Sequence, residues 1–219
     1  MKLYEGWRSS ASWRVRWALA LKKLPYESVW LDVAAGEHMR VLPNLNPLCT
    51  VPTLELPGGD VLTESVAIIE WLDETRPDPP LLPGDPRARA RVRQLVQLVN
   101  ADIHPLQNTS VRRAIAADER AQNAWCAHWI ERGLSAYEAL VRAQTGRFSL
   151  GDSLTMADLF LIPQIESAER FGAEIRACKG IRSIYDACLA TPEAQATHPR
   201  SAEARAMAAR RMESAPSES

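Results

Sequence analysis

The sequence predicts a chain of two parts, an α/β region over residues 1–82 and an all-α region over residues 88–208. Short segments of strand and helix character alternate along the first region. A proline-rich stretch then interrupts this alternation. Beyond that stretch the apolar residues recur at helical spacing. We therefore expect a mixed sheet covered by helices, followed by a separate helical domain.

The first region opens with a strand, a helix and a second strand. Residues 2–4 (KLY) begin a short strand, and Trp13, Trp17 and Leu21 recur at the spacing of a helix. Residues 26–33 (YESVWLDV) are rich in aromatic and β-branched side chains, which favour a strand.

A hairpin and a helix complete the first region. Residues 51–56 (VPTLEL) and 60–64 (DVLTE) have strand character and are joined by a Pro-Gly-Gly turn. Residues 65–76 (SVAIIEWLDETR) then predict a helix with its apolar side chains on one side. Strand–helix–strand followed by strand–strand–helix implies a mixed sheet with helices packed against it. The segment before the hairpin has no clear pattern and is expected to be a loop.

The second region follows a stretch that cannot sustain a helix. Residues 76–89 contain five prolines in fourteen positions and predict a stiff linker. Apolar residues then recur at helical spacing over 89–108, 121–143 and 153–171. In the last of these, Thr155 and Asp158 form a capping-box pattern. Residues 209–219 are polar and predict a flexible tail.

Composition excludes several classes of function. The chain has 26 basic and 27 acidic residues, so no excess positive charge favours nucleic acid or an anionic membrane as a partner. No segment reaches the roughly 18 apolar residues that cross a bilayer, and the first residues have no apolar signal core. The four cysteines are scattered without ligand spacing, so we expect no disulfide framework and no metal site. A reducing cytoplasm fits this cysteine usage best.

Two serines stand where the first helix is expected to begin. If the helix starts near Ser10, its first backbone N–H groups lack internal partners and the helix dipole places positive potential there. A hydroxyl at this point donates a further hydrogen bond to an anion, and Arg8 and Arg14 add positive charge nearby. The alternative is that Ser10 only caps the helix.

Two further places in the first region suit an extended ligand. A proline at a strand entry, as in Val51–Pro52, is a plausible cis site whose backbone faces outward, although an ordinary trans edge proline is the alternative. Ser65 opens the next helix, so it offers a second anion site or a plain cap. Together the three places suit a peptide-like molecule that carries both a thiolate and a carboxylate.

These motifs resemble the zeta class of glutathione transferases, the family that includes maleylacetoacetate isomerase and maleylpyruvate isomerase. The resemblance covers almost the whole chain. A serine-rich helix start followed by WRVR is specific to this class, whereas the VPT and ES elements are shared by most glutathione transferases. The matching segments are RSSASWRVRWALALK (8–22), LNPLCTVPTL (45–54), TESVAIIEWLDETRPDPPLLPGDP (63–86), DIHPLQNTSV (102–111), GDSLTMADLFLIPQIESAERF (151–171) and THPRS near the end.

The resemblance implies a thioredoxin-like N-terminal domain, an all-helical C-terminal domain that completes the substrate site, a homodimer and a cis bond before Pro52. It also implies a role for each matching position. Ser10 would bind the glutathione sulfur, with Ser9 and Ala11 in the same turn, and Arg8 beside them. The other implied glutathione contacts are His38, Val51, Pro52, Glu64 and Ser65 from the first domain and His104, Gln107, Asn108 and Ser110 from the second.

The activity implied is glutathione-dependent cis–trans isomerisation of a maleyl keto-acid, with Arg8 and Arg170 binding the substrate. Maleylpyruvate isomerases of this kind carry arginines just after the position of Asn108, where this chain has Thr109 and Ser110. That difference favours maleylacetoacetate, an intermediate of tyrosine and phenylalanine catabolism. Relatives commonly have cysteine where Ala11 stands, so this chain lacks that thiol and the nucleophile it would supply, while the Ser10 hydroxyl is retained.

Three alternatives remain open. The chain could isomerise maleylpyruvate instead, or conjugate or dehalogenate small electrophiles with the same thiolate. From another class, it could be a non-catalytic scaffold. Glutathione consumption separates isomerase from transferase, and absence of glutathione binding would favour the scaffold.

Overall fold

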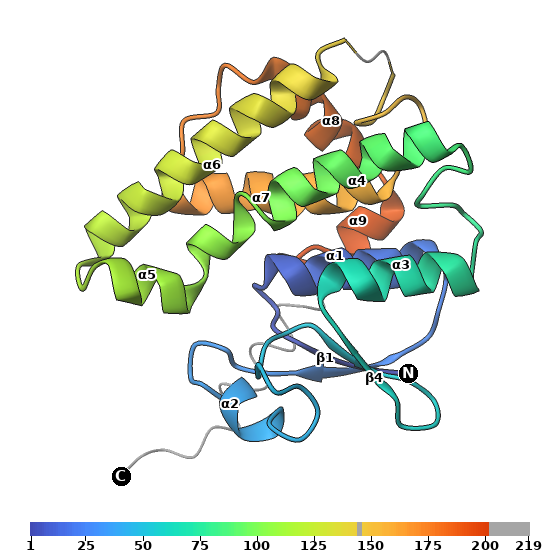
Figure 1. The fold of residues 1–219 in the computed structure, drawn as a ribbon, viewed down its shortest axis with the longest axis vertical. Coiled ribbons are helices and arrows are strands. Elements are labelled where there is room, and N and C mark those ends of the chain that lie inside the picture. The colour runs from blue at the N-terminus through green and yellow to red at the C-terminus, as the bar shows by residue number, and fades with distance from the viewer. Residues whose placement is uncertain (144–145, 202–219) are drawn as a thin grey trace. The chain divides into compact units, whose positions relative to one another are not determined.

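A mixed sheet forms the centre of the first part of the chain in the computed structural model, which describes residues 1–143 and 146–201 (Figure 1). The strands lie in the order β2-β1-β3-β4. β1 pairs in parallel with β2 and antiparallel with β3, and β3 pairs antiparallel with β4. The strand bounds are β1 Lys2–Glu5, β2 Glu27–Trp30, β3 Thr53–Glu55 and β4 Val61–Thr63.

Helices cover both faces of this sheet. α1 (Ser10–Leu21) and α3 (Ser65–Thr75) lie together on one face, and the short α2 (His38–Val41) lies on the other (Figure 1). Leu3 and Leu54 are opposite each other in the β1–β3 register and are both fully buried. The sheet therefore has the apolar core that its strand pattern predicts.

α1 is enclosed on several sides rather than one. Residues 12–19 are all buried, because α3, the sheet and the short helix α9 (Pro192–Thr197) pack around α1. Charged residues are almost never fully buried unless they are paired. Arg14 and Arg16 are nevertheless buried in this helix, at 0% and 3% exposure. Their polar contacts shape the site described below.

The second part of the chain is helical. α7 is buried nearly all round and contains Pro163, and α4 and α6 pack against it. The expected capping box at its start is confirmed, since Asp158 Oδ2 accepts from the backbone N–H of Thr155 at 2.8 Å. The bounds are α4 Pro86–Asn100, the 3-10 helix η1 His104–Gln107, α5 Thr109–Ile115, α6 Glu119–Val141, α7 Met156–Phe171 and α8 Lys179–Leu189.

The expected α/β plus all-α architecture is confirmed, and the structure adds details. The chain divides into two compact units, Met1–Pro79 with residues 191–201, and Pro80–Ala190. The segment from 191 on thus belongs with the first unit, whereas the sequence pattern placed it with the helical region. The expected tail, residues 209–219, lies outside the described residues.

The proline-rich stretch differs from the expected linker. Leu81 and Leu82 are buried at 1% and 4% exposure, and the Leu81 carbonyl accepts from the N–H of Met156 at 2.9 Å. From Pro80 on, this stretch is therefore an anchored part of the second unit. Asp85 then caps α4 by accepting from the N–H of Ala88, and Pro86 occupies the first turn, where its missing N–H costs nothing.

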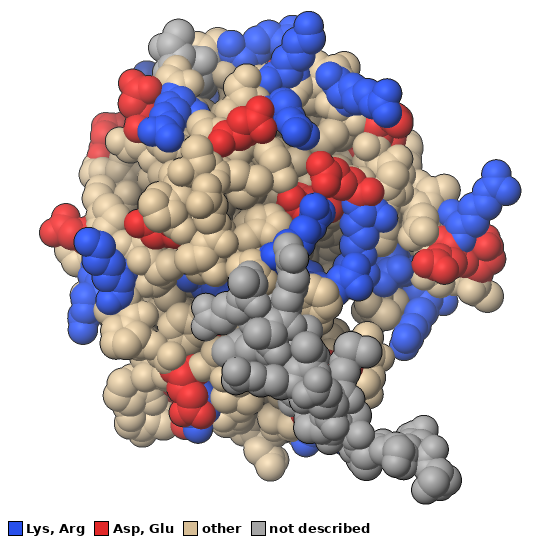
Figure 2. Space-filling model, turned by 180° about the vertical axis from the view of Figure 1, so that it is seen from behind, with Lys and Arg blue, Asp and Glu red and all other residues tan. Residues whose placement is uncertain are grey.

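Charge is mixed over the surface. On the face shown in Figure 2, acidic and basic side chains are interspersed. This agrees with the near-zero net charge of −1. Within the described ranges, no helix is long and apolar enough to cross a membrane.

Candidate active site

The two serines at the start of α1 have different local roles. Ser9 is the N-cap, with extended backbone angles, and its hydroxyl oxygen accepts from the N–H of Ser12 at 3.2 Å. Ser10 is the first helical residue, and its side chain is partly exposed. The capping role proposed as the alternative for Ser10 thus belongs to Ser9. Ser10 places a second hydroxyl beside the N–H groups of the first helical turn.

The turn that leads into α1 is fixed by its own backbone and by Ser12. The N–H of Ser9 donates to the carbonyl of Gly6 at 3.0 Å, and the N–H of Gly6 donates to the Ser12 hydroxyl at 3.3 Å. A Cβ at position 6 would lie 3.0 Å from Cγ2 of Val33, so only glycine fits there without a shift. Arg8 is exposed on this turn, with its guanidinium 5.3 Å from the centre of the Trp7 ring.

A buried arginine links α1 to the start of α3. Nη1 of Arg14 donates to the hydroxyl oxygen of Ser65 at 3.2 Å. Burial lowers the pKa of Arg14 to about 9, because the charged form is disfavoured away from water. Ser65 is the first residue of α3 and is 4% exposed. The Arg14 guanidinium therefore contacts the Ser65 hydroxyl at the start of α3, where the sequence predicts a second anion site.

The residue before α3 has an uncommon backbone conformation. Glu64 has a φ of 67°, in the left-handed region that non-glycine residues rarely adopt. Such strain persists only where the surrounding structure imposes it, and it is concentrated at functional sites. Glu64 is exposed, so its side chain and backbone are accessible to a ligand.

The Val51–Pro52 bond is cis, as the resemblance implies. Asn46 supports the loop before it, donating from Nδ2 to the carbonyl of Thr50 at 3.0 Å and to the hydroxyl of Thr53 at 3.1 Å. Asn46 is 2% exposed. The loop before β3 is thus held from inside, and Val51 packs on the cluster of Leu31, Leu42 and Cys49. Cys49 belongs to this apolar cluster and is 7% exposed.

His38 opens α2, and its ring nitrogen Nδ1 is buried without a hydrogen-bond partner among the described residues. Buried polar atoms are normally hydrogen-bonded, so each exception calls for an explanation. A ligand or water that reaches this nitrogen would satisfy it.

In the second unit, Gln107 is held by a buried partner that the sequence did not reveal. Gln107 and Gln164 exchange two hydrogen bonds between their amide groups, at 3.3 and 3.1 Å. Nε2 of Gln107 also lies 3.3 Å from Nδ1 of His104. Gln164 is fully buried in α7, so it fixes the Gln107 amide directly and His104 through Gln107. Asn108 is the N-cap position of α5, where it and Ser110 are exposed.

Two arginines in the second unit share one aromatic ring. The guanidinium of Arg170 lies 5.2 Å from the centre of the Phe171 ring, and that of Arg112 lies 5.4 Å from it. Burial raises the pKa of the neighbouring Cys126 thiol, while the charges of both arginines act in the opposite direction. Arg112 was not singled out from the sequence, because an arginine in a short polar helix carries no distinctive signal. Its Nη2 donates to the hydroxyl of Thr109 at 3.3 Å.

The fold and these positions define a class of protein. A mixed sheet of order β2-β1-β3-β4 with a cis proline before β3, joined to a helical unit, is the architecture of the glutathione transferases. The family model for the glutathione S-transferase N-terminal domain matches residues 8–75.

Comparison with full-length relatives gives the class within this family. A maleylpyruvate isomerase from Ralstonia sp is 47% identical over 195 residues, which cover 86% of this chain and 92% of the relative. The holo structure of a maleylpyruvate isomerase, described as a bacterial zeta-class glutathione S-transferase, matches with a TM-score of 0.87 and 44% identity, over 91% of this chain and 97% of that one. A maleylacetoacetate isomerase from Anaeromyxobacter dehalogenans with glutathione in its active site matches with a TM-score of 0.83 and 43% identity, over 90% and 94%. The chain belongs to the zeta class of glutathione transferases.

Proposed function

We propose that the chain is a glutathione-dependent cis–trans isomerase of a maleyl keto-acid, and that it converts maleylacetoacetate to fumarylacetoacetate. Family membership supports the reaction type, since the matched relatives are named as maleylpyruvate and maleylacetoacetate isomerases. The single observation that carries the proposal is the division of roles at the start of α1. Ser9 supplies the cap, and we assign the hydroxyl of Ser10, the first helical residue, to the cofactor sulfur beside the first backbone N–H groups of α1.

The residues of the first unit fit glutathione. Its carboxylates suit the start of α3, where the first backbone N–H groups and the Ser65 hydroxyl meet the positive charge of Arg14. Nδ1 of His38, which is buried and has no hydrogen-bond partner in the described part of the chain, suits the glycyl end. The partly exposed Val51, directly before the cis bond to Pro52, suits the cysteinyl part.

When bound, glutathione supplies a thiolate nucleophile that adds to the conjugated double bond, permits rotation about it and is then expelled. The role of the protein is to keep that sulfur ionised. A free thiol has a pKa of about 8.5, so only a few per cent is ionised at neutral pH. The Ser10 hydroxyl and the α1 N-terminus stabilise the anion, and each unit of lowering requires about 1.4 kcal/mol of preferential stabilisation. We assign the catalytic role to Ser10, with Ser9 and Arg8 in the same turn and Ala11 lining it.

A keto-diacid substrate requires positive charge. We assign substrate binding to Arg8 and Arg170, which would also stabilise the enolate that develops on addition. Arg112, beside Arg170 on the Phe171 ring, adds to the positive potential of the second unit. For the remaining second-unit positions, His104, Gln107, Asn108 and Ser110, we keep the ligand-binding role implied by the resemblance. Thr109 and Ser110 stand where maleylpyruvate isomerases carry arginines, which supports maleylacetoacetate as substrate.

The wider setting follows from this substrate. We assign the chain to tyrosine and phenylalanine catabolism in the cytoplasm, where thiols stay reduced, and expect it to act as a homodimer. The described cysteines are all free, in agreement with a reducing compartment.

The test is a panel assay with glutathione limiting. Maleylacetoacetate and maleylpyruvate are supplied in large excess over glutathione, and both product and free thiol are measured. The proposal predicts many turnovers per glutathione, with no thiol consumed and a higher kcat/KM for maleylacetoacetate. A higher kcat/KM for maleylpyruvate would establish the second candidate, which the 47% identity to the Ralstonia enzyme supports. Consumption of one thiol per product molecule would establish a conjugating transferase. If the protein does not bind glutathione, the non-catalytic scaffold is the alternative that remains.

A further inference from the structure

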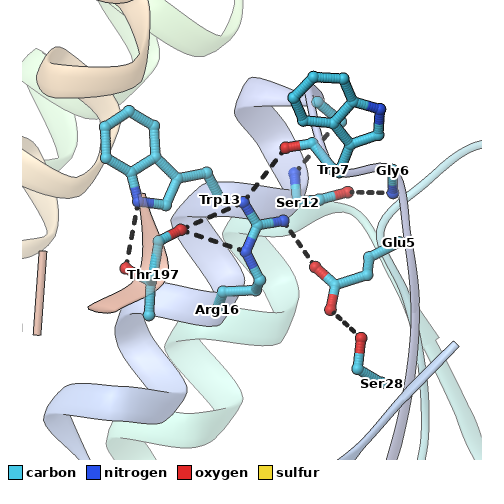
Figure 3. Close-up of polar contacts among 9 residues, drawn as sticks. Glu5, Gly6, Trp7, Ser12, Trp13, Arg16, Ser28 and Thr197 are labelled. Atoms are coloured by element: carbon cyan, nitrogen blue, oxygen red, sulfur yellow. Dashed lines mark hydrogen bonds and ion pairs between the residues drawn. The ribbon is translucent and has the colours of Figure 1, made fainter. Parts of the chain in front are cut away.

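A buried arginine joins the turn before Ser10 to the end of a helix near the opposite end of the chain (Figure 3). Arg16 lies in α1 and is 3% exposed. Its Nη1 donates to Glu5 Oε2 at 2.6 Å. Glu5 ends β1 and is fully buried, and its other oxygen accepts from the Ser28 hydroxyl of β2 at 2.6 Å. The guanidinium is therefore anchored to the sheet by a charge-assisted bond.

The second edge of the guanidinium faces two carbonyl groups. Nη2 of Arg16 donates to the carbonyl of Trp7 at 3.4 Å and to the carbonyl of Thr197 at 3.3 Å. Nε donates to the same Thr197 carbonyl at 3.4 Å. Trp7 and Arg8 form the turn that directly precedes Ser9 and Ser10. The contact therefore reaches the proposed thiolate site through the backbone.

Thr197 is the last residue of α9, where carbonyl groups lack partners within the helix and the dipole is negative. A cation at this position stabilises the helix end. Trp13, one turn before Arg16 on the same side of α1, adds a second anchor, because its indole N–H donates to the Thr197 hydroxyl at 3.2 Å. Its ring also packs edge-on against His198, with ring centres 4.7 Å apart.

We propose that Arg16 is a positioning residue for the turn before Ser10, and that the C-terminal end of α9 takes part in this positioning. The guanidinium holds the Trp7 carbonyl, and thus the turn before Ser10, at a place set jointly by Glu5 and Thr197. The planar fork of arginine suits this task, since it donates in several fixed directions at once, whereas the lysine ammonium is a point charge on a flexible stem. The inference rests on the proposed function for its effect on the thiol, but the positioning itself does not require glutathione.

The test compares two buried ion pairs, one made from the middle of α1 by Arg16 and one made just past its end by Lys22. Arg16→Lys keeps a cation beside Glu5 but loses the fork. Thr197→Val keeps the side-chain shape and removes the hydroxyl that Trp13 contacts. The matched control is Asp73→Asn, which breaks the buried pair of Lys22 and Asp73, whose atoms lie 2.5 Å apart just after α1 ends. About twelve helical residues, or roughly 18 Å, separate that pair from Ser10.

Two quantities are measured for each variant. The first is the pKa of glutathione bound at saturation, from the ultraviolet absorbance of its thiolate. The second is amide hydrogen exchange over residues 6–12 without glutathione. We expect Arg16→Lys to raise the bound thiol pKa by about one unit and to speed exchange in this turn, with a smaller change in the same direction for Thr197→Val. Asp73→Asn should lower thermal stability while leaving both quantities at the wild-type values.

The outcomes separate the inference from the proposed function. The positioning role is overturned if the bound thiol pKa and the exchange over residues 6–12 are the same in wild type and Arg16→Lys. It is also overturned if Arg16→Lys and Asp73→Asn change these two quantities equally. A change in Arg16→Lys without any in Thr197→Val overturns the part assigned to α9. If wild-type protein leaves the thiol pKa at its free value while exchange over 6–12 responds to Arg16→Lys, the positioning role stands and the proposed function fails.

Discussion

Nη1 of Arg14 donates to the hydroxyl oxygen of Ser65 at 3.2 Å, and this bond joins the body of α1 to the first residue of α3. A hydroxyl that accepts from a buried cation keeps its own proton free to donate, and bonds in such a chain strengthen each other. Ser65 is therefore set up as a donor, which suits a carboxylate better than a neutral ligand.

The first prediction concerns this pair. Ser65→Ala should weaken glutathione binding on the order of tenfold or more, because a hydrogen bond to a charged group is worth about 1.5–3 kcal/mol. Arg14→Met should weaken it as well, but should have a much smaller effect when Ser65 is already alanine. Calorimetric titration of the two single variants and the double variant measures this coupling. Arg76→Met, at the exposed other end of α3, is the control. Additive losses from Arg14→Met and Ser65→Ala would show that the two residues act separately.

The second prediction contrasts the adjacent serines. Ser9→Ala removes the cap that accepts from Ser12 and should lower the free energy of unfolding by about 1 kcal/mol, with little loss of turnover. Ser10→Ala should lower kcat on the order of 100-fold, as expected when a donor to a developing anion is removed. Unfolding in urea and steady-state kinetics on the same preparations check both values. Similar kcat losses in the two variants would contradict the division of roles.

The third prediction concerns the buried amide pair of the second unit. Gln164→Met should cost about 1–3 kcal/mol of stability, because it leaves the buried amide of Gln107 without its partner. It should also raise the KM for glutathione, since Gln107 is then free to rotate. Gln97→Met, at an exposed position of α4, is the control and should change neither quantity. An unchanged KM in Gln164→Met would remove Gln107 from the proposed contacts.

The fourth prediction concerns pH. Burial raises the pKa of Asp158 above its ordinary value, although Ser149 and Thr155 donate to it. The folded chain thus holds this proton more tightly than the unfolded chain. The contribution of the Asp158 carboxyl to the free energy of unfolding therefore falls as pH rises from about 3.9 through the raised pKa.

Asp158→Asn removes that titration and should flatten the curve of stability against pH over this range. It should also lower stability at pH 7 by about 1–3 kcal/mol, because the amide replaces one accepting oxygen with a donor. Denaturant unfolding between pH 4 and 7 measures both effects. Asp152→Asn, an exposed carboxylate in the preceding turn, should keep the wild-type slope. If the stability of Asp158→Asn depends on pH with the same slope as that of the wild type, the pH dependence belongs to other groups.

Sequence patterns predicted the architecture because the elements concerned carry strong local signals. The strand runs, the helix after Ser65 and the capping box of Thr155 and Asp158 depend on residues close together in the chain. α2 was expected to be a loop, since its four residues are too few to show helical spacing. The placement of α9 with the first unit depends on contacts between residues such as Trp13 and Thr197, 184 positions apart, which no local pattern contains.

The candidate site likewise has features that local sequence signals predict and features that depend on contacts between distant residues. The anion-binding start of α1 could be predicted from two serines before an apolar helix, but the choice of Ser9 as the cap depends on backbone angles that either serine can adopt. The buried arginines could not be predicted, because WRVR gives no indication that Ser65 and Glu5 lie within reach of their side chains. Gln164 was missed for a related reason, since a glutamine on a buried helix is identifiable only with its partner in view.

The central claim is that the start of α1 keeps a bound sulfur ionised. Its most direct test is a titration of glutathione bound to the wild-type protein and to Ser10→Ala, followed through the ultraviolet absorbance of the thiolate. The account predicts a thiol pKa about two units below the free value of roughly 8.5 in the wild-type complex, and a value close to the free one in Ser10→Ala. A bound thiol that titrates in the wild-type complex as it does in buffer would contradict the account.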